Sequence, residues 1–217
     1  MTTEDVKDAL ELDLILGRIK PGDRLIEDNL IQRFGVKRHM VRSALERLER
    51  MGLVERPQNK GAHVRVYSEH EVDELTSLRE DLMHLAVQHM RLPISSEVAA
   101  ELRSICAAHK EAVESQDQVG VVHHNNAFHL LLFKQCGNRF LVEAIERTIG
   151  ALKGFRSQRV NNPEIMKRAA EEHELMIQAA TQGDRDFLAT LCVGHLGPAL
   201  KSYLDNREDR DEKGEPG

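Results

Sequence analysis

The chain has 217 residues, of which 30% are charged and 4% aromatic, and it contains no tryptophan. It has neither a run of eighteen apolar residues nor an apolar N-terminal segment, so we expect no membrane helix and no signal peptide, and therefore a cytoplasmic protein. Its three cysteines, an odd number without a CxxC pair, argue against a disulfide framework or a thiolate zinc site. We expect Cys106, Cys136 and Cys192 to be buried, reduced core residues.

The net charge of −6 is unevenly distributed along the chain. Residues 14–67 hold 12 basic and 6 acidic side chains, which gives +6, whereas residues 68–217 hold 17 basic and 25 acidic side chains, which gives −8. A basic segment inside an acidic protein indicates a local nucleic-acid-binding surface. The composition, rich in Leu and Ala, favours helices elsewhere.

Residues 25–51 predict two short amphipathic helices joined by a tight turn at Gly35. The first carries Leu25, Ile26, Leu30, Ile31 and Phe34, and the second carries Met40 or Val41, Ala44, Leu45 and Leu48 at spacings of three and four. This is the helix-turn-helix pattern, whose second helix enters a DNA major groove. Its opposite face holds arginines that can contact phosphates and guanine edges.

A strand, a polar turn and a second strand are predicted directly after these helices. The strands cover 53–56 and 63–66, and the turn contains Lys60 and Gly61. Together with a helix over 5–16, the segment reads as a winged helix-turn-helix domain of residues 1–67. We therefore expect double-stranded DNA as a partner.

The rest of the chain predicts an all-α bundle over residues 68–206, followed by a charged, disordered tail over 207–217. The fold class is thus mainly α. Helices are expected over 69–91, 96–116, 118–136, 139–160, 163–182 and 185–206. On the first of these helices we expect one buried side formed by Val72, Leu75, Leu78, Leu82, Leu85, Ala86 and His89.

The N-terminal segment resembles the DNA-binding domain of GntR-family bacterial transcription regulators. The matching motifs are G-x-[IL]-x-P-G-x-x-L from Gly17, G-V-x-R-x-x-V-R-x-A-L from Gly35, and E-x-x-G-L-V from Glu49. The resemblance implies that Arg38 and Arg42 contact the operator and that the wing reaches the minor groove. The expected DNA-binding residues are Lys37, Arg38, His39, Arg42, Lys60 and Gly61. Lys37 stands where the family usually has Ser or Thr, and Asp28 stands where some members use arginine.

Three of the eleven histidines lie on apolar faces of separate predicted helices: His129, His173 and His195. Each could point into the bundle, where a buried imidazole needs a partner. Spacing alone leaves open whether they meet at a metal or pack separately.

Residues 69–206 resemble the FCD effector domain of the FadR-like branch of the family. In metal-binding members the ligands follow D-x-x-x-H on one helix and one histidine on each of two later helices. The resemblance implies a site made of Asn125, His129, His173 and His195, with asparagine in place of the usual aspartate. The expected cofactor is a divalent ion such as Zn²⁺ or Ni²⁺, whose open positions would receive a small organic acid.

The resemblance also implies that Arg79 contacts the carboxylate of the effector, because a guanidinium binds carboxylates in a bidentate manner. A salt bridge to a neighbouring acid is the competing interpretation, and Arg156, Arg159 and Arg168 are further candidates. We expect a homodimeric repressor whose operator affinity changes with effector. The alternatives are a metal-dependent enzyme built on the three histidines and a regulator with a structural metal or none.

Overall fold

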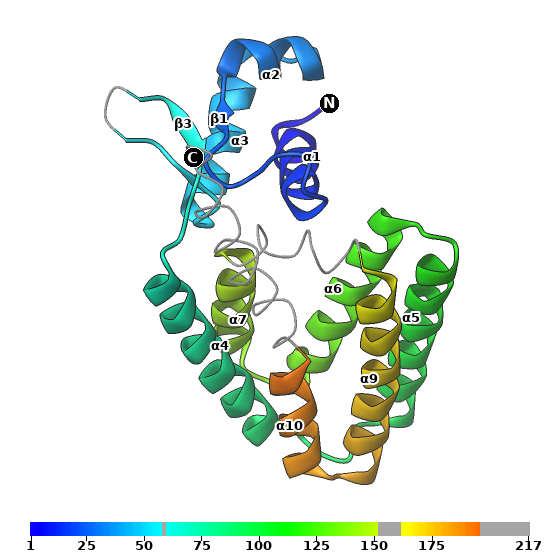
Figure 1. The fold of residues 1–217 in the computed structure, drawn as a ribbon. Helices are drawn as coiled ribbons and strands as arrows, with labels where there is room; N and C mark the ends of the chain where they lie inside the picture. Colours follow the sequence, from blue (N-terminus) through cyan, green and yellow to red (C-terminus); the bar gives the residue numbers. More distant parts are fainter. Residues whose placement is uncertain (58–59, 152–161, 196–217) are drawn as a thin grey trace.

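The computed structural model describes residues 1–57, 60–151 and 162–195. A small domain with a β-sheet wing lies at one end, and a bundle of longer helices lies at the other (Figure 1). The first domain contains α1 (Thr3–Ile15), β1 (Arg24–Leu25), α2 (Glu27–Phe34), α3 (Arg38–Arg50), β2 (Val54–Glu55) and β3 (Ala62–Val64). The three strands form an antiparallel sheet in the order β1-β3-β2.

The helix-turn-helix forms where the sequence predicted it. Gly35 ends α2 with φ of 63°, a left-handed conformation that costs glycine little, and its N–H donates to the Ile31 carbonyl. The predicted apolar face of α3 is fully buried, with Val41, Leu45 and Leu48 at 0% exposure. These side chains join α1 residues in the core of the domain, where replacing one leucine by alanine costs about 2–5 kcal/mol.

The beginning of the predicted helix-turn-helix is wrong by two residues. Leu25 belongs to β1, where it pairs with Ala62 of the wing, and Ile26 is the residue that precedes α2. Ile26 is 44% exposed, so it does not belong to the buried face. A two-residue strand was missed because its pairing partner lies 37 positions further along the chain.

The second part is helical, as predicted. It contains α4 (Glu69–His89), α5 (Ser96–Glu114), α6 (Gln118–Lys134), α7 (Arg139–Ala151), α9 (Pro163–Gln182) and α10 (Arg185–Gly194). Ser68 and Glu71 form a capping box at the start of α4, and Asn162 caps α9. The predicted extensions over 152–160 and 196–206, and the predicted disordered tail, lie outside the described residues.

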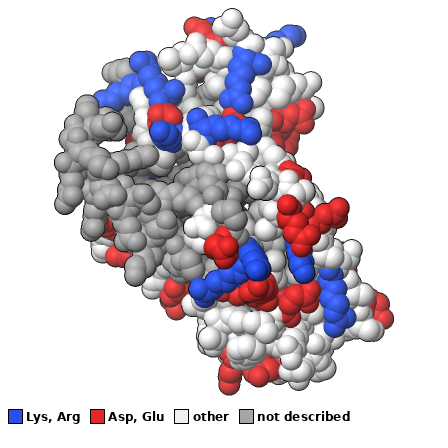
Figure 2. Space-filling model, turned by 45° about the vertical axis from the view of Figure 1, so that its right-hand side comes forward, with Lys and Arg blue, Asp and Glu red and all other residues white. Residues whose placement is uncertain are grey.

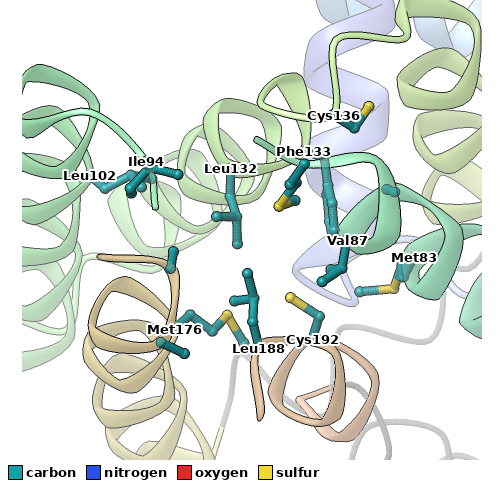
Figure 3. Close-up of a cluster of buried hydrophobic side chains, with 14 of the residues drawn as sticks. Met83, Val87, Ile94, Leu102, Leu132, Phe133, Cys136, Met176, Leu188 and Cys192 are labelled. Carbon is teal, nitrogen blue, oxygen red and sulfur yellow. The ribbon is translucent and has the colours of Figure 1, made fainter. Parts of the chain in front are cut away.

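The helical core brings together residues that are far apart in the sequence. α5 packs against α6 and α9, while α10 packs against α4 and α9. Met83 and Val87 of α4, Leu132 of α6, Met176 of α9 and Cys192 of α10 meet in this core (Figure 3). The predicted burial of all three cysteines is confirmed. This packing places the inward faces of α6, α9 and α10 opposite one another.

The predicted buried side of α4 is partly wrong. Val72 and Ala86 are buried as expected, but Leu78 and Leu85 are 49% and 46% exposed. Met83 and Val87 pack into the bundle in their place. α4 has apolar residues around much of its circumference, so the sequence pattern did not distinguish the face that meets the bundle.

The surface reflects the charge distribution of the sequence. Basic side chains gather at the end formed by the winged domain, whereas acidic and basic side chains are mixed over the helical part (Figure 2). Among the residues that the structure describes, no helix is both long and apolar enough to cross a membrane.

Candidate DNA-binding surface and metal centre

The predicted DNA-binding residues are displayed together on the winged domain. Lys37 precedes α3, whose first two turns expose Arg38, His39 and Arg42, and Lys60 is exposed at the wing. Gly61 has φ of 80°, which any side chain would strain, and so forms the tight turn of the wing. The arrangement has the form of a major-groove helix with a neighbouring wing.

Two acidic residues of α2 pair with the arginines of α3. Arg38 donates to Glu27 Oε2 at 3.1 Å and to Asp28 Oδ1 at 2.5 Å, while Arg42 Nε donates to Glu27 at 3.0 Å. The hydrogen bond with Asp28 is the main cause that raises the pKa of Arg38. These pairs are exposed and therefore weak in water. DNA phosphates must nevertheless compete with two carboxylates for these guanidinium groups.

Three histidines converge inside the helical bundle. His129 of α6, His173 of α9 and His195 at the end of α10 are at most 5% exposed, and their ligand atoms all lie within 4.8 Å of one another. The convergence that spacing left open is thus present. We refer to these three residues as the histidine cluster.

The geometry of the histidine cluster fits a divalent metal. His129 Nε2 and His173 Nε2 are 3.3 Å apart. Zn–N bonds of ~2.05 Å in a tetrahedral arrangement separate two ligand nitrogens by about 3.3–3.4 Å. Three neutral imidazoles are a suitable donor set for Zn²⁺ or Ni²⁺.

Neighbouring side chains hold the imidazoles in place. Phe128 stacks on His173 with ring centroids 4.0 Å apart. Glu172 Oε2 lies 2.7 Å from His195 Nδ1, and Glu172 Oε1 accepts a hydrogen bond from Arg168 Nε at 2.7 Å. A carboxylate on Nδ1 fixes the tautomer that leaves Nε2 directed at a metal.

Sequence reasoning assigned no role to two residues beside the cluster. His109 of α5 is fully buried, and its ring lies 5.1 Å from that of His173. The spacing Leu102, Cys106, His109 on α5 could have indicated its inward position. Nothing in the sequence places Glu172 against a histidine 23 residues later.

The other two predicted site residues are less directly placed. Asn125 is half-buried one helical turn before His129, and its amide donates to Asn126 at 3.5 Å. Arg79 is buried on α4, which does not carry a member of the cluster. Their roles as metal ligand and effector contact remain predictions. Of the other candidates, Arg168 pairs with Glu172, whereas Arg156 and Arg159 lie outside the described residues.

Comparisons with known proteins match the N-terminal part and the helical part of the chain to two different family models. Residues 2–64 match the model of bacterial regulatory proteins of the gntR family, and residues 74–197 match that of the FCD domain. The chain is 25% identical to the HTH-type transcriptional regulator McbR of Escherichia coli over 187 residues, which cover 85% of this chain and 84% of McbR. It is 28% identical to LutR of Bacillus subtilis, with coverage of 83% and 91%. It is 23% identical to the gluconate operon transcriptional repressor of Bacillus licheniformis, with coverage of 92% and 79%.

The fold of the chain is also that of a solved member. The structure of E. coli McbR superposes with a TM-score of 0.78 at 22% identity, covering 94% of this chain and 98% of that one. The related proteins are regulators, and none of these comparisons supports the enzyme alternative. The chain therefore belongs to the GntR family, with an FCD domain after its helix-turn-helix domain, and it is a DNA-binding transcription regulator rather than an enzyme.

Proposed function

We propose that this regulator is a homodimeric repressor whose operator affinity is controlled by a small carboxylate bound at a divalent metal. The metal would be held by His129, His173 and His195, with the Asn125 carbonyl oxygen as a neutral fourth ligand. The observation that carries the proposal is the burial of three imidazoles whose ligand atoms lie within 4.8 Å of one another. One of the related regulators is named a repressor, which supports the direction of control.

A bound Zn²⁺ or Ni²⁺ would offer open coordination positions to a carboxylate. Replacing the usual aspartate by Asn125 removes one negative charge from the ligand set, which leaves the site more cationic and so favours an anionic effector. Glu172 would stabilise His195 as a ligand through Nδ1. Arg79 is proposed as a second contact with the carboxylate.

A leucine stripe on α4 supports the homodimer. Leu75, Leu78, Leu82 and Leu85 follow one another at spacings of three, four and three, which is the repeat of a coiled-coil seam. Two of them are about half exposed. A second copy of α4 would cover the stripe, and the resulting twofold axis would present two α3 helices to a palindromic operator.

The close approach of the two domains at the end of α7 supports coupling. A Cβ at Gly150, in the last turn of α7, would lie 3.8 Å from the backbone oxygen of Met51, where α3 ends. A ligand that shifts α7 would therefore change the position of α3, the proposed recognition helix. The resulting shift in the equilibrium between the two domain arrangements is set by the ligand's difference in affinity for them.

Operator binding measured by fluorescence anisotropy tests the proposal, with a site first selected from random DNA. Zn²⁺-loaded protein should lose operator affinity when a carboxylate from a panel containing acetate, lactate, citrate and hexanoate is added. His173→Ala should retain operator affinity and lose the response, while His84→Ala, which changes an exposed histidine of α4, should behave as wild type. If His173→Ala abolished operator binding while remaining folded, the proposed division of labour would be wrong.

A further inference from the structure

A cavity lies between α6 and α7 and extends from one side of the histidine cluster. Its volume is about 340 Å³, within the range of small-molecule sites. Both helices contribute residues to its lining, mostly at spacings of three or four positions. The described lining residues are Ala127, Leu130, Phe133, Val142, Ile145 and Ile149, which are apolar, and His123, Asn126, His129 and Glu146, which are polar.

The polar residues of this cavity's lining come mainly from α6. His129 belongs both to the cavity wall and to the histidine cluster, so a molecule in the cavity reaches the proposed metal. Asn126 and His123 precede it by three and six residues on the same helix face. Glu146 of α7 is exposed and is the acidic member of the lining.

The apolar part of the lining is larger than a small hydroxy acid requires. Phe133 and Ile145 are at most 2% exposed and form a hydrophobic floor. Among the described lining residues, none is lysine or arginine, so a second carboxylate would meet Glu146 without a compensating cation. A hydrocarbon body suits this wall, whereas a polyanion does not.

We propose that the effector is a monocarboxylate with an apolar body, a medium-length alkyl chain or an aromatic ring, that lies between α6 and α7. This inference rests on the proposed function and specifies its ligand class. The carboxylate faces His129 and the metal, and the body packs against Phe133, Val142 and Ile145. Because Gly150, near the end of α7, lies close to Met51 at the end of α3, a ligand that wedges between α6 and α7 acts on the end of α3.

Titration calorimetry on full-length, Zn²⁺-loaded protein tests the ligand class with acetate, butanoate, hexanoate, benzoate and succinate. Each buried methylene should raise affinity about fourfold, so hexanoate, with four more methylenes, should bind roughly 250-fold more tightly than acetate. Succinate, which matches butanoate in length, should bind more weakly than butanoate. An affinity that does not change from acetate to hexanoate would overturn the inference.

Three variants distinguish the contribution of the cavity to ligand binding from that of the metal site. Ala127→Phe, which fills the cavity, should abolish the dependence on chain length while metal content stays at the wild-type level. Val119→Phe places the same ring on an exposed position of α6 outside the described lining and should leave the dependence intact. Glu146→Gln should raise the affinity for succinate and leave that for hexanoate unchanged.

Metal content is measured in every sample, so that a failure of the proposed function can be distinguished from a failure of the inferred ligand class. Absence of metal would contradict the proposed function. A metal-loaded protein that binds all acids equally, or an Ala127→Phe variant that still prefers hexanoate, would contradict the apolar-bodied ligand alone.

Discussion

The two halves of this molecule assemble their functional residues in opposite ways. The predicted DNA-binding residues Lys37, Arg38, His39 and Arg42 are close together in the sequence, exposed, and positioned by one turn and one helix start. The histidine cluster is buried and drawn from three helices whose histidines are 44 and 22 residues apart. A local site can therefore be recognised from spacing, whereas a dispersed site exists only once the helices have packed.

The largest expected effect is the loss of operator affinity when the two arginines of α3 are removed. The double variant Arg38→Ala, Arg42→Ala should weaken operator binding by 100-fold or more, since each base or phosphate contact contributes ~1–3 kcal/mol. Metal content should not change, because the histidine cluster lies in the other half. Anisotropy with Arg103→Ala, an exposed arginine of α5, serves as the control. Equal binding by the double variant would exclude α3 as the recognition helix.

In the histidine cluster, we expect metal affinity to depend on Glu172, which positions the proposed ligand His195. Glu172→Gln removes the carboxylate charge from His195 Nδ1 and should lower metal affinity about 10- to 100-fold. Competition with a chromophoric chelator measures the affinity. Glu171→Gln, one residue earlier and exposed, is the matched control. If both variants bound metal as wild type, Glu172 would have no role in positioning the ligand.

A variant with increased operator affinity would test the role of the acidic residues that pair with the arginines of α3. Asp28→Asn removes one of the two carboxylates that pair with Arg38, and with it a negative charge beside the DNA, so operator affinity should rise several-fold. The dependence of affinity on salt concentration should also steepen. Asp73→Asn, an exposed change in α4, should have no effect. Weaker binding by Asp28→Asn would indicate that the carboxylate positions Arg38 for DNA.

The smallest effect concerns the buried thiols. Burial raises the pKa of Cys106 and Cys192 to about 12, so both are protonated at pH 8 in the folded protein. Iodoacetamide should alkylate them slowly in native protein and rapidly after unfolding in urea, as followed by mass spectrometry. Rapid labelling of native Cys192 would mean that the core around α10 opens readily.

Local features of the sequence were enough to predict much of the fold. Gly35 and the spacing of Val41, Leu45 and Leu48 predicted the helix-turn-helix because a turn and an amphipathic face are set by neighbouring residues. β1 was missed because a two-residue strand is defined by its partner in the wing. The face of α4 was misassigned because Leu78 and Leu85 continue an apolar pattern without packing into the bundle.

The histidine cluster was proposed from a family resemblance, since spacing did not establish convergence. The structure brings His129, His173 and His195 together and adds Glu172 and His109 beside them. Spacing on α5 could have indicated that His109 points inward, but neither His109 nor Glu172 could be placed beside the cluster from the sequence, because helix packing determines which side chains meet. Arg79 illustrates the same limit, because its burial on α4 does not by itself identify what it binds.

Metal content of protein purified without chelator and without a histidine tag tests the central claim most directly. Wild type and His84→Ala should each contain about one equivalent of divalent metal, as expected for a site of three imidazoles. His129→Ala should contain none and should lose the thermal stabilisation that metal confers on the folded state. Wild-type protein that holds no metal, and takes up none from excess Zn²⁺ or Ni²⁺, would contradict the account and show that Asn125 does not sustain the site.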